Sequence, residues 1–253
     1  MSAIWVIAST EFRRMFVSPL AWSILAVVQF ILAWMFLLGV NEYTLQTQAT
    51  AVGSEDMAGI SEALIPFLFS TAASIMLVVT PLMTMRLFAE ERMNQTLILL
   101  TSSPVSNTQI VLGKYLSVLG FVLLFVALVA LMPLSLALAT PLDWGQLAAA
   151  SLGLLLLLAA FAAAGLFLSS LARQPVIAAV TTFGFLLLLD VLYQSGNAQG
   201  SASELFVYLS AFGHFLSFVK GVFDSGDLVY YLLFIAGFVI LTIRKLDNDR
   251  LQG

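Results

Sequence analysis

Residues 111–139 read VLGKYLSVLGFVLLFVALVALMPLSLALA, a run of 29 residues in which Lys114 is the only charged side chain. An α-helix rises about 1.5 Å per residue, so about 20 apolar residues cross the hydrocarbon core of a bilayer. Backbone N–H and C=O groups find no water in lipid, and a helix satisfies them internally. The run therefore predicts a transmembrane helix.

Five more apolar runs recur along the chain, and the composition agrees with them. Of the 253 residues 61% are hydrophobic and 9% are charged, whereas a soluble domain is about 45–50% apolar. The mean hydropathy is +1.03. Cysteine is absent, which excludes disulfides and thiolate metal sites. We predict an all-α integral membrane protein, one transmembrane domain over 1–253 with six spans at about 19–40, 63–88, 111–139, 146–171, 176–193 and 227–243.

The segment before the first span is amphipathic. Residues 3–17, AIWVIASTEFRRMFV, place Trp5, Ala8, Phe12 and Phe16 on one helical face and the two arginines elsewhere. Such a helix lies flat at a membrane surface, so we expect an interfacial helix here. The first span is too long for the hydrophobic region of a signal peptide, and we expect it to be retained.

The basic residues gather on one side of a six-span bundle. Both termini share that side, and nine of the ten Lys and Arg residues lie on it: Arg13, Arg14, Arg86, Arg92, Lys114, Arg173, Arg244, Lys245 and Arg250. Nine of the fourteen acidic residues lie on or near the other side. Because cytoplasmic loops are enriched in Lys and Arg, we expect both termini in the cytoplasm.

The scarce charges crowd between the second and third spans. In FAEERMNQTLILLTSSPVS, residues 88–106, Glu90, Glu91 and Arg92 follow closely on Arg86. A charged side chain at mid-bilayer costs about 2.5–3.5 kcal/mol on insertion scales. We therefore expect this stretch to lie on the cytoplasmic side of the membrane.

A helical pattern continues through the stretch. An apolar face would be formed by Ala89, Met93, Leu97 and Leu100. This helix should end near Ser103, because the residue before a proline is pushed out of the α region. Ser106 and Gln109 match a capping box for the next helix. Lys114 is expected to extend its amine back to the lipid headgroups.

Two interpretations of this stretch stay open. It is either an ordinary solvated loop with a cluster of charges that stops transfer, or a docking element for a cytoplasmic partner. The docking interpretation is favoured by four successive apolar residues, Leu97, Ile98, Leu99 and Leu100, which need a surface to cover them.

The sequence EERMNQTLILLTSSPVSNTQIVLGKY, residues 90–115, resembles the coupling-helix region of ABC-type export permeases, the six-span membrane subunits of the ABC-2 family. The resemblance implies an all-α permease domain with a coupling helix between spans two and three. It also implies contacts to an ATP-binding subunit through Glu90, Glu91, Arg92, Thr96, Leu97, Leu99, Leu100 and Pro104. Two positions depart from the family pattern, since Gln95 stands for the usual glycine and Ile98 for the usual acidic residue.

The resemblance further implies a second copy of the permease and a separate ATP-binding subunit that binds ATP and Mg²⁺. The chain itself has no phosphate-binding loop. Around its Gly113-Lys114 pair, Thr108 stands where the motif needs Gly and Tyr115 where it needs Ser or Thr. No HExxH or Gly-x-Ser-x-Gly motif and no cluster of metal ligands is present, so we expect no enzyme activity and no metal site in this chain.

The C-terminal stretch HFLSFVKGVFDSGDLVYYLLFIAGFVILTIRKL, residues 214–246, looks most similar to the gliding-motility and nitrous-oxide-reductase-maturation permeases of the same family. Asp190, His214, Asp224 and Asp227 are candidate transport or outer-loop residues. Asp190, near the end of the fifth span, is either an intramembrane functional acid or an interfacial one. His214, the only histidine, is either a proton switch or a structural residue.

The leading hypothesis is therefore the permease of an ATP-driven exporter in a bacterial inner membrane. One rival is a secondary transporter, although such carriers usually hold ionisable residues in mid-span and these spans do not. Another rival is a membrane anchor that recruits a cytoplasmic complex. The uncharged span interiors favour a lipid-like or hydrophobic cargo. The bilayer is an expected partner, and nucleic acid is not.

Overall fold

A computed structural model describes residues 3–50, 60–96, 105–137, 142–196 and 210–252. Within these ranges the regular structure is helical and no strand is present. The helices are α1 (Ala3–Val17), α2 (Pro19–Thr50), α3 (Ile60–Thr84), α4 (Ala89–Met93), α6 (Asn107–Leu136), α7 (Trp144–Leu171), α8 (Pro175–Gly196), α10 (Ala211–Val219) and α11 (Ser225–Gln252).

Six helical segments in the described ranges are long and apolar enough to cross a membrane: Pro19–Leu45, Glu62–Met93, Asn107–Leu136, Trp144–Leu171, Pro175–Tyr193 and Ser225–Arg250. This confirms the prediction of an all-α integral membrane protein with six spans. The second segment joins α3 and α4 across a turn at residues 85–88. Each segment contains a long run of high mean hydropathy, which is why hydropathy alone located it.

Several helices extend beyond the apolar runs. α2 continues past residue 40 to Thr50, and α11 continues past residue 243 to Gln252, beyond the predicted ends of the first and sixth spans. α6 begins at Asn107, ahead of the predicted start at 111, because a capping box fixes its first turn. The start of α6 is therefore set by hydrogen bonding and not by the limit of the apolar run.

α7 is the central helix and contacts α3, α6, α8, α10 and α11. Glycines allow its closest contacts. A Cβ atom on Gly165 would lie 2.3 Å from Thr84 Oγ1, and one on Gly153 would lie 2.5 Å from Phe218 Cβ. α2, α8 and α11 lie at the periphery, where few of their residues are buried and each exposes several large apolar side chains. Close packing is thus concentrated around α7.

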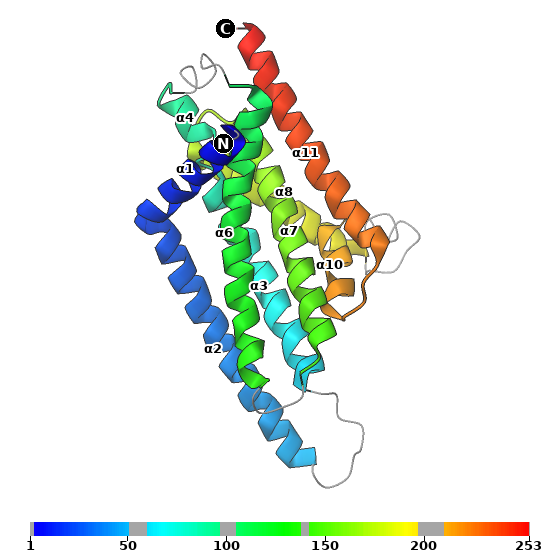
Figure 1. Ribbon diagram of the computed structural model, residues 1–253. Helices are drawn as coiled ribbons and strands as arrows, with labels where there is room; N and C mark the ends of the chain where they lie inside the picture. Colours follow the sequence, from blue (N-terminus) through cyan, green and yellow to red (C-terminus); the bar gives the residue numbers. More distant parts are fainter. Residues whose placement is uncertain (1–2, 51–59, 97–104, 138–141, 197–209, 253) are drawn as a thin grey trace.

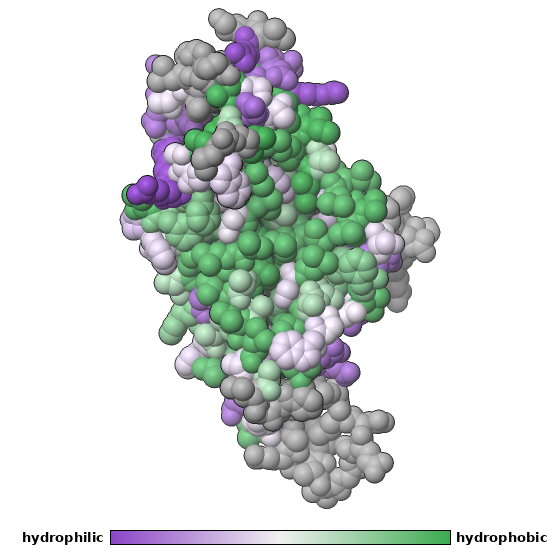
Figure 2. All heavy atoms as spheres, in the orientation of Figure 1, coloured by the Kyte–Doolittle hydropathy of each residue, from purple (hydrophilic) through white to green (hydrophobic). Residues whose placement is uncertain are grey.

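The chain termini lie at the same end of the bundle, together with α4 (Figure 1). Figure 2 shows apolar residues over the middle of the visible face and hydrophilic residues gathered at that end. We call it the basic end, because it holds the nine Lys and Arg residues of the positive side named above. The other end holds the end of α2, the start of α3 and the start of α7.

The close contact at Gly165 can be tested by adding one methyl group. Gly165→Ala should destabilise the protein by about 1–3 kcal/mol, because the short, branched Thr84 side chain cannot move far enough to make room. Gly184→Ala is the matched control, since a Cβ there meets nothing within 4 Å. Thermal unfolding in detergent measures both. Equal melting temperatures for the two variants would contradict the described contact between α3 and α7.

Candidate functional site

α4 is a short helix whose first turn is capped by a neighbouring span. Its own N-cap residue, Phe88, makes no side-chain cap. Instead, the backbone N–H groups of Phe88 and Ala89 donate to Oγ of Ser169 in α7, at 3.1 and 3.2 Å. The same hydroxyl donates to the Met85 carbonyl at 3.0 Å. The start of α4 is therefore held by hydrogen bonds to α7.

Each charged residue of α4 is paired with a different helix. Three contacts, which we call the anchor pairs, are Glu90 Oε1 with Arg14 Nη2 of α1 at 3.4 Å, Glu91 Oε1 with Lys114 Nζ of α6 at 2.5 Å, and Arg92 with Asp249 of α11. The Glu90 pair is partly solvent-exposed and contributes at most about 1 kcal/mol. The anchor pairs connect α4 to helices that are remote in sequence.

Lys114 is the most deeply buried of these charges, with a side chain 2% exposed. Its ammonium group donates to Glu91 at 2.5 Å and to Glu11 of α1 at 2.7 Å. It also lies 5.4 Å from the centroid of the Phe88 ring. The prediction that Lys114 extends to the headgroups is wrong, because two carboxylates inside the protein bind its amine instead. Lys114 thus joins α1, α4 and α6.

Two glycines of α6 let α1 approach closely enough for this contact. A Cβ on Gly113 would lie 2.7 Å from Ile7 Cβ, and one on Gly120 would lie 3.0 Å from the Phe12 ring. The two positions are seven residues apart, so they share one face of α6. The Gly-Lys pair therefore has a structural explanation: the glycine admits α1, and the lysine binds its carboxylate.

α4 ends in a Schellman motif. The N–H of Thr96 donates to the Glu91 carbonyl at 2.9 Å, and the N–H of Gln95 donates to the Arg92 carbonyl at 3.2 Å. Gln95 has φ 58°, in the left-handed region that favours glycine. This is the position at which the coupling-helix pattern has its usual glycine. The structure therefore explains that glycine as the residue that ends the helix.

The helix accordingly ends at Met93, and the predicted end near Ser103 is wrong. In the sequence, the helical spacing of apolar residues continues beyond Met93, but the left-handed backbone at Gln95 ends the helix. Met93, Asn94 and Thr96 are exposed. Of the predicted coupling residues, Leu97, Leu99, Leu100 and Pro104 lie outside the described residues.

The chain re-enters the described region just before α6. The predicted capping box is present: Ser106 Oγ accepts from the Gln109 N–H at 3.3 Å, and Gln109 Oε1 accepts from the Ser106 N–H at 3.2 Å. Asn107 Nδ2 then donates to Asp247 Oδ1 of α11 at 2.7 Å. Together with Asp249, this contact lets α11 hold both ends of the connection between α4 and α6.

Sequence reasoning missed these partners, although one signal pointed to them. Of the fourteen acidic residues, nine lie on or near the opposite side and five lie at the basic end. All five bind a side chain of another helix: Glu11, Glu90, Glu91, Asp247 and Asp249. An acidic residue on the side of the protein that carries most of the Lys and Arg residues was thus a candidate for an ion pair or hydrogen bond with another helix. Ser169, an ordinary serine in an apolar span, carried no such signal.

Where α10 meets the start of α11, beside the middle of the bundle in Figure 1, two of the candidate residues lie together. His214 Nδ1 of α10 lies 2.6 Å from Asp227 Oδ1 of α11, and the His214 ring stacks on Tyr230 with centroids 4.1 Å apart. Asp224 does not join the pair; its carboxylate accepts from the Gly226 N–H at 2.8 Å and caps α11. Asp190 is partly buried near the end of α8. Among the described residues no group of three or more ligands could hold a metal ion.

Removing the charge of Lys114 should destabilise the protein strongly. Lys114→Met leaves the buried Glu91 and the half-buried Glu11 without their cation, and breaking a buried pair costs about 3–5 kcal/mol. Lys220→Met, at an exposed lysine of the opposite end, is the control and should change little. Thermal unfolding in detergent is the measurement. Adding Glu91→Gln to Lys114→Met should restore part of the loss, and no restoration would contradict the pairing.

The left-handed residue that ends α4 offers a stabilising change. Gln95→Gly should raise the free energy of unfolding by about 1 kcal/mol, because glycine adopts positive φ without the steric cost. Asn94→Gly is the control: φ at Asn94 is −85°, so glycine relieves nothing there. Both changes are read from the melting temperature and from the rate of proteolysis near α4. A lower stability for Gln95→Gly than for Asn94→Gly would refute this backbone conformation.

The comparison with known families agrees with this architecture. The sequence model of a family described as ABC-2 family transporter protein matches residues 5–220, from α1 through the end of α10. None of the curated protein sequences matches the chain. Most of the C-terminal stretch lies beyond the match, so its closer likeness to gliding-motility and nitrous-oxide-reductase-maturation permeases stays a prediction. With six apolar spans and a family match over most of its length, the chain belongs to the ABC-2 family of transporter membrane proteins.

Proposed function

We propose that this chain is the permease subunit of an ATP-driven exporter. The observation that carries the proposal is α4, a short helix that exposes Met93 and Asn94 at the basic end while its charged residues bind three other helices. In this proposal the basic end faces the cytoplasm of a bacterial cell, and both termini lie there. An ATP-binding subunit contacts the exposed residues and the segment that follows them.

The anchor pairs give the predicted coupling residues two different roles. Glu91 and Arg92 point into the protein and position α4, so they transmit movement and do not contact the ATPase directly. Met93, Asn94 and Thr96 are exposed and form the start of the docking surface, which continues into Leu97, Leu99, Leu100 and Pro104. When the ATPase closes on ATP and Mg²⁺, it displaces α4, and the anchor pairs carry the displacement to α1, α6 and α11.

The proposed assembly contains two permeases and two ATP-binding subunits. α2, α8 and α11 expose large apolar side chains along their length, which suits contact with lipid or with a second copy. The buried charged residues of the described spans lie near the ends of their own helices, and the buried side chains of α7 are uncharged, which favours an uncharged, lipid-like or hydrophobic cargo. ATP hydrolysis takes place in the partner, and this chain supplies the transport path.

The docking surface can be tested with Met93→Asp. Met93 is 54% exposed, and a carboxylate buried there without a partner should weaken binding of an ATP-binding subunit at least about tenfold. The measurement is co-purification with a candidate ABC ATP-binding subunit, such as one encoded beside this chain, followed by ATP-dependent cargo movement in liposomes.

The matched control is Val222→Asp, which changes a residue of similar exposure, 58%, at the opposite end. It should leave binding of the ATPase unchanged. Equal binding by both variants would place the docking surface elsewhere. Binding of an ATPase without ATP-dependent transport would favour a membrane anchor, and transport without any ATPase would favour a secondary carrier.

A further inference from the structure

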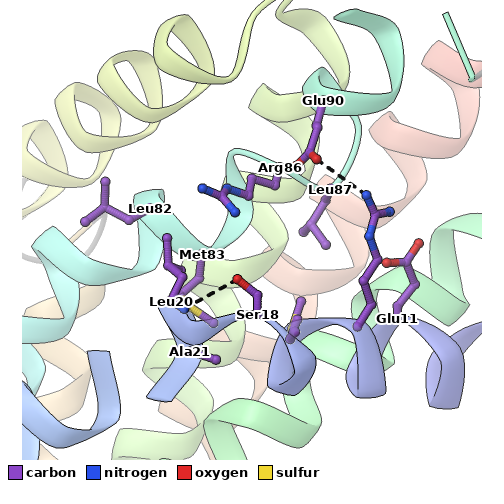
Figure 3. A pocket seen from close by; sticks show the side chains of 11 residues that line it. Glu11, Ser18, Leu20, Ala21, Leu82, Met83, Arg86, Leu87 and Glu90 are labelled. Carbon is purple, nitrogen blue, oxygen red and sulfur yellow. Dashed lines mark hydrogen bonds and ion pairs between the residues drawn. The ribbon is translucent and has the colours of Figure 1, made fainter. Parts of the chain in front are cut away.

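A small cavity lies where α1 bends into α2, beside the end of α3. Its volume is about 100 Å³, and it is lined by polar residues on one side and apolar residues on the other. Figure 3 shows the Arg86 guanidinium turned away from Glu90, toward Leu82 and above Met83. Leu20 and Ala21, in the first turn of α2, line the same space, so the positive end of that helix dipole faces it.

Among the residues that the structure describes, Arg86 differs from the other charged residues of the cavity in having no partner. Around the cavity, Arg14 binds Glu90, and Glu11 is bound by Lys114. Arg86 is exposed and makes no ion pair or hydrogen bond with any residue that the structure describes. An arginine that follows the end of α3 and pairs with no described residue beside an apolar wall is available to bind an anion.

The position of the cavity matches the boundary between lipid headgroups and acyl chains. Trp22, on the first turn of α2, is 59% exposed and donates its indole N–H to the Phe16 carbonyl at 2.8 Å. Exposed tryptophans of this kind mark the membrane interface. Leu82, 42% exposed, lies one turn from Arg86 on the side toward the bilayer centre. A ligand would thus meet a guanidinium and an apolar wall together.

We propose that this cavity binds the phosphodiester headgroup of a bilayer phospholipid, in the leaflet that contains α1. The guanidinium of Arg86 donates to the phosphate oxygens, and the first carbons of an acyl chain lie along Leu82. Arginine forms charge-assisted, bidentate bonds with phosphate, and basic pockets between transmembrane helices bind headgroups in this way. The lipid is a structural ligand and not the cargo, so this proposal does not depend on transport.

The carboxylates around the cavity favour a lipid over free phosphate. Glu11 and Glu90 both line it, and they repel a dianion more strongly than the single negative charge of a phosphodiester. Free phosphate would also leave the apolar wall uncovered. A diacyl lipid satisfies the arginine and covers Leu82 and Met83 together.

Native mass spectrometry of the full chain, released from nanodiscs containing phosphatidylglycerol and phosphatidylethanolamine, tests the proposal. The wild type should retain bound phospholipid. Arg86→Gln should reduce the retained lipid about tenfold, since a charge-assisted bond to phosphate is lost. Arg86→Lys should retain an intermediate amount, because it keeps the charge but not the bidentate geometry.

Arg13→Gln is the matched control. It removes one exposed positive charge from α1 but does not line the cavity, so it should retain lipid as the wild type does. Equal retention by Arg86→Gln and Arg13→Gln would overturn the proposal. Displacement of the lipid by millimolar inorganic phosphate would also overturn it, since the site would then be one for free phosphate. Arg86 has no partner in the described structure, so in lipid-free detergent the melting temperature of Arg86→Gln should equal that of the wild type, whereas added phospholipid should raise it less than it raises that of the wild type.

Discussion

A buried ammonium group held between two carboxylates determines how the basic end of this protein is assembled. Lys114 lies at the start of a transmembrane helix, where an unpaired charge would be costly to bury. Its two partners come from α1 and from α4. Those helices must therefore lie against α6 whenever the bundle is folded, and Gly113 removes the side chain that would keep α1 away.

The other contacts of α4 follow from that position. Ser169 caps its first turn from α7, Asp249 binds Arg92 from α11, and the left-handed Gln95 ends the helix after five residues. A helix this short has almost no stability by itself. It exists because its neighbours satisfy its backbone and its charges. A force applied to its exposed residues would therefore be shared by the surrounding helices, as the proposed coupling role requires.

Sequence reasoning located the spans because hydropathy is a local property, and it located the capping box because Ser106 and Gln109 are three residues apart. It placed Lys114 wrongly because its partner Glu11 is 103 residues away. The Arg92–Asp249 pair joins residues 157 positions apart, and no local pattern connects them. The end of α4 was missed for another reason. Gln95 has a left-handed backbone, but it is not the glycine that usually indicates one and that the family pattern has at this position. The glycine in that pattern was the only hint of a left-handed residue.

Hydrogen–deuterium exchange of α1 tests the central claim most directly, since it reports whether Lys114 joins α1 to α4 and α6. The full chain is measured in nanodiscs as wild type, Lys114→Met and the control Lys220→Met. The account predicts that Lys114→Met speeds exchange in residues 3–17 and in residues 89–96 together, while Lys220→Met leaves both unchanged. Faster exchange confined to residues 89–96, with α1 still protected, would show that Lys114 does not hold α1 and would contradict the account.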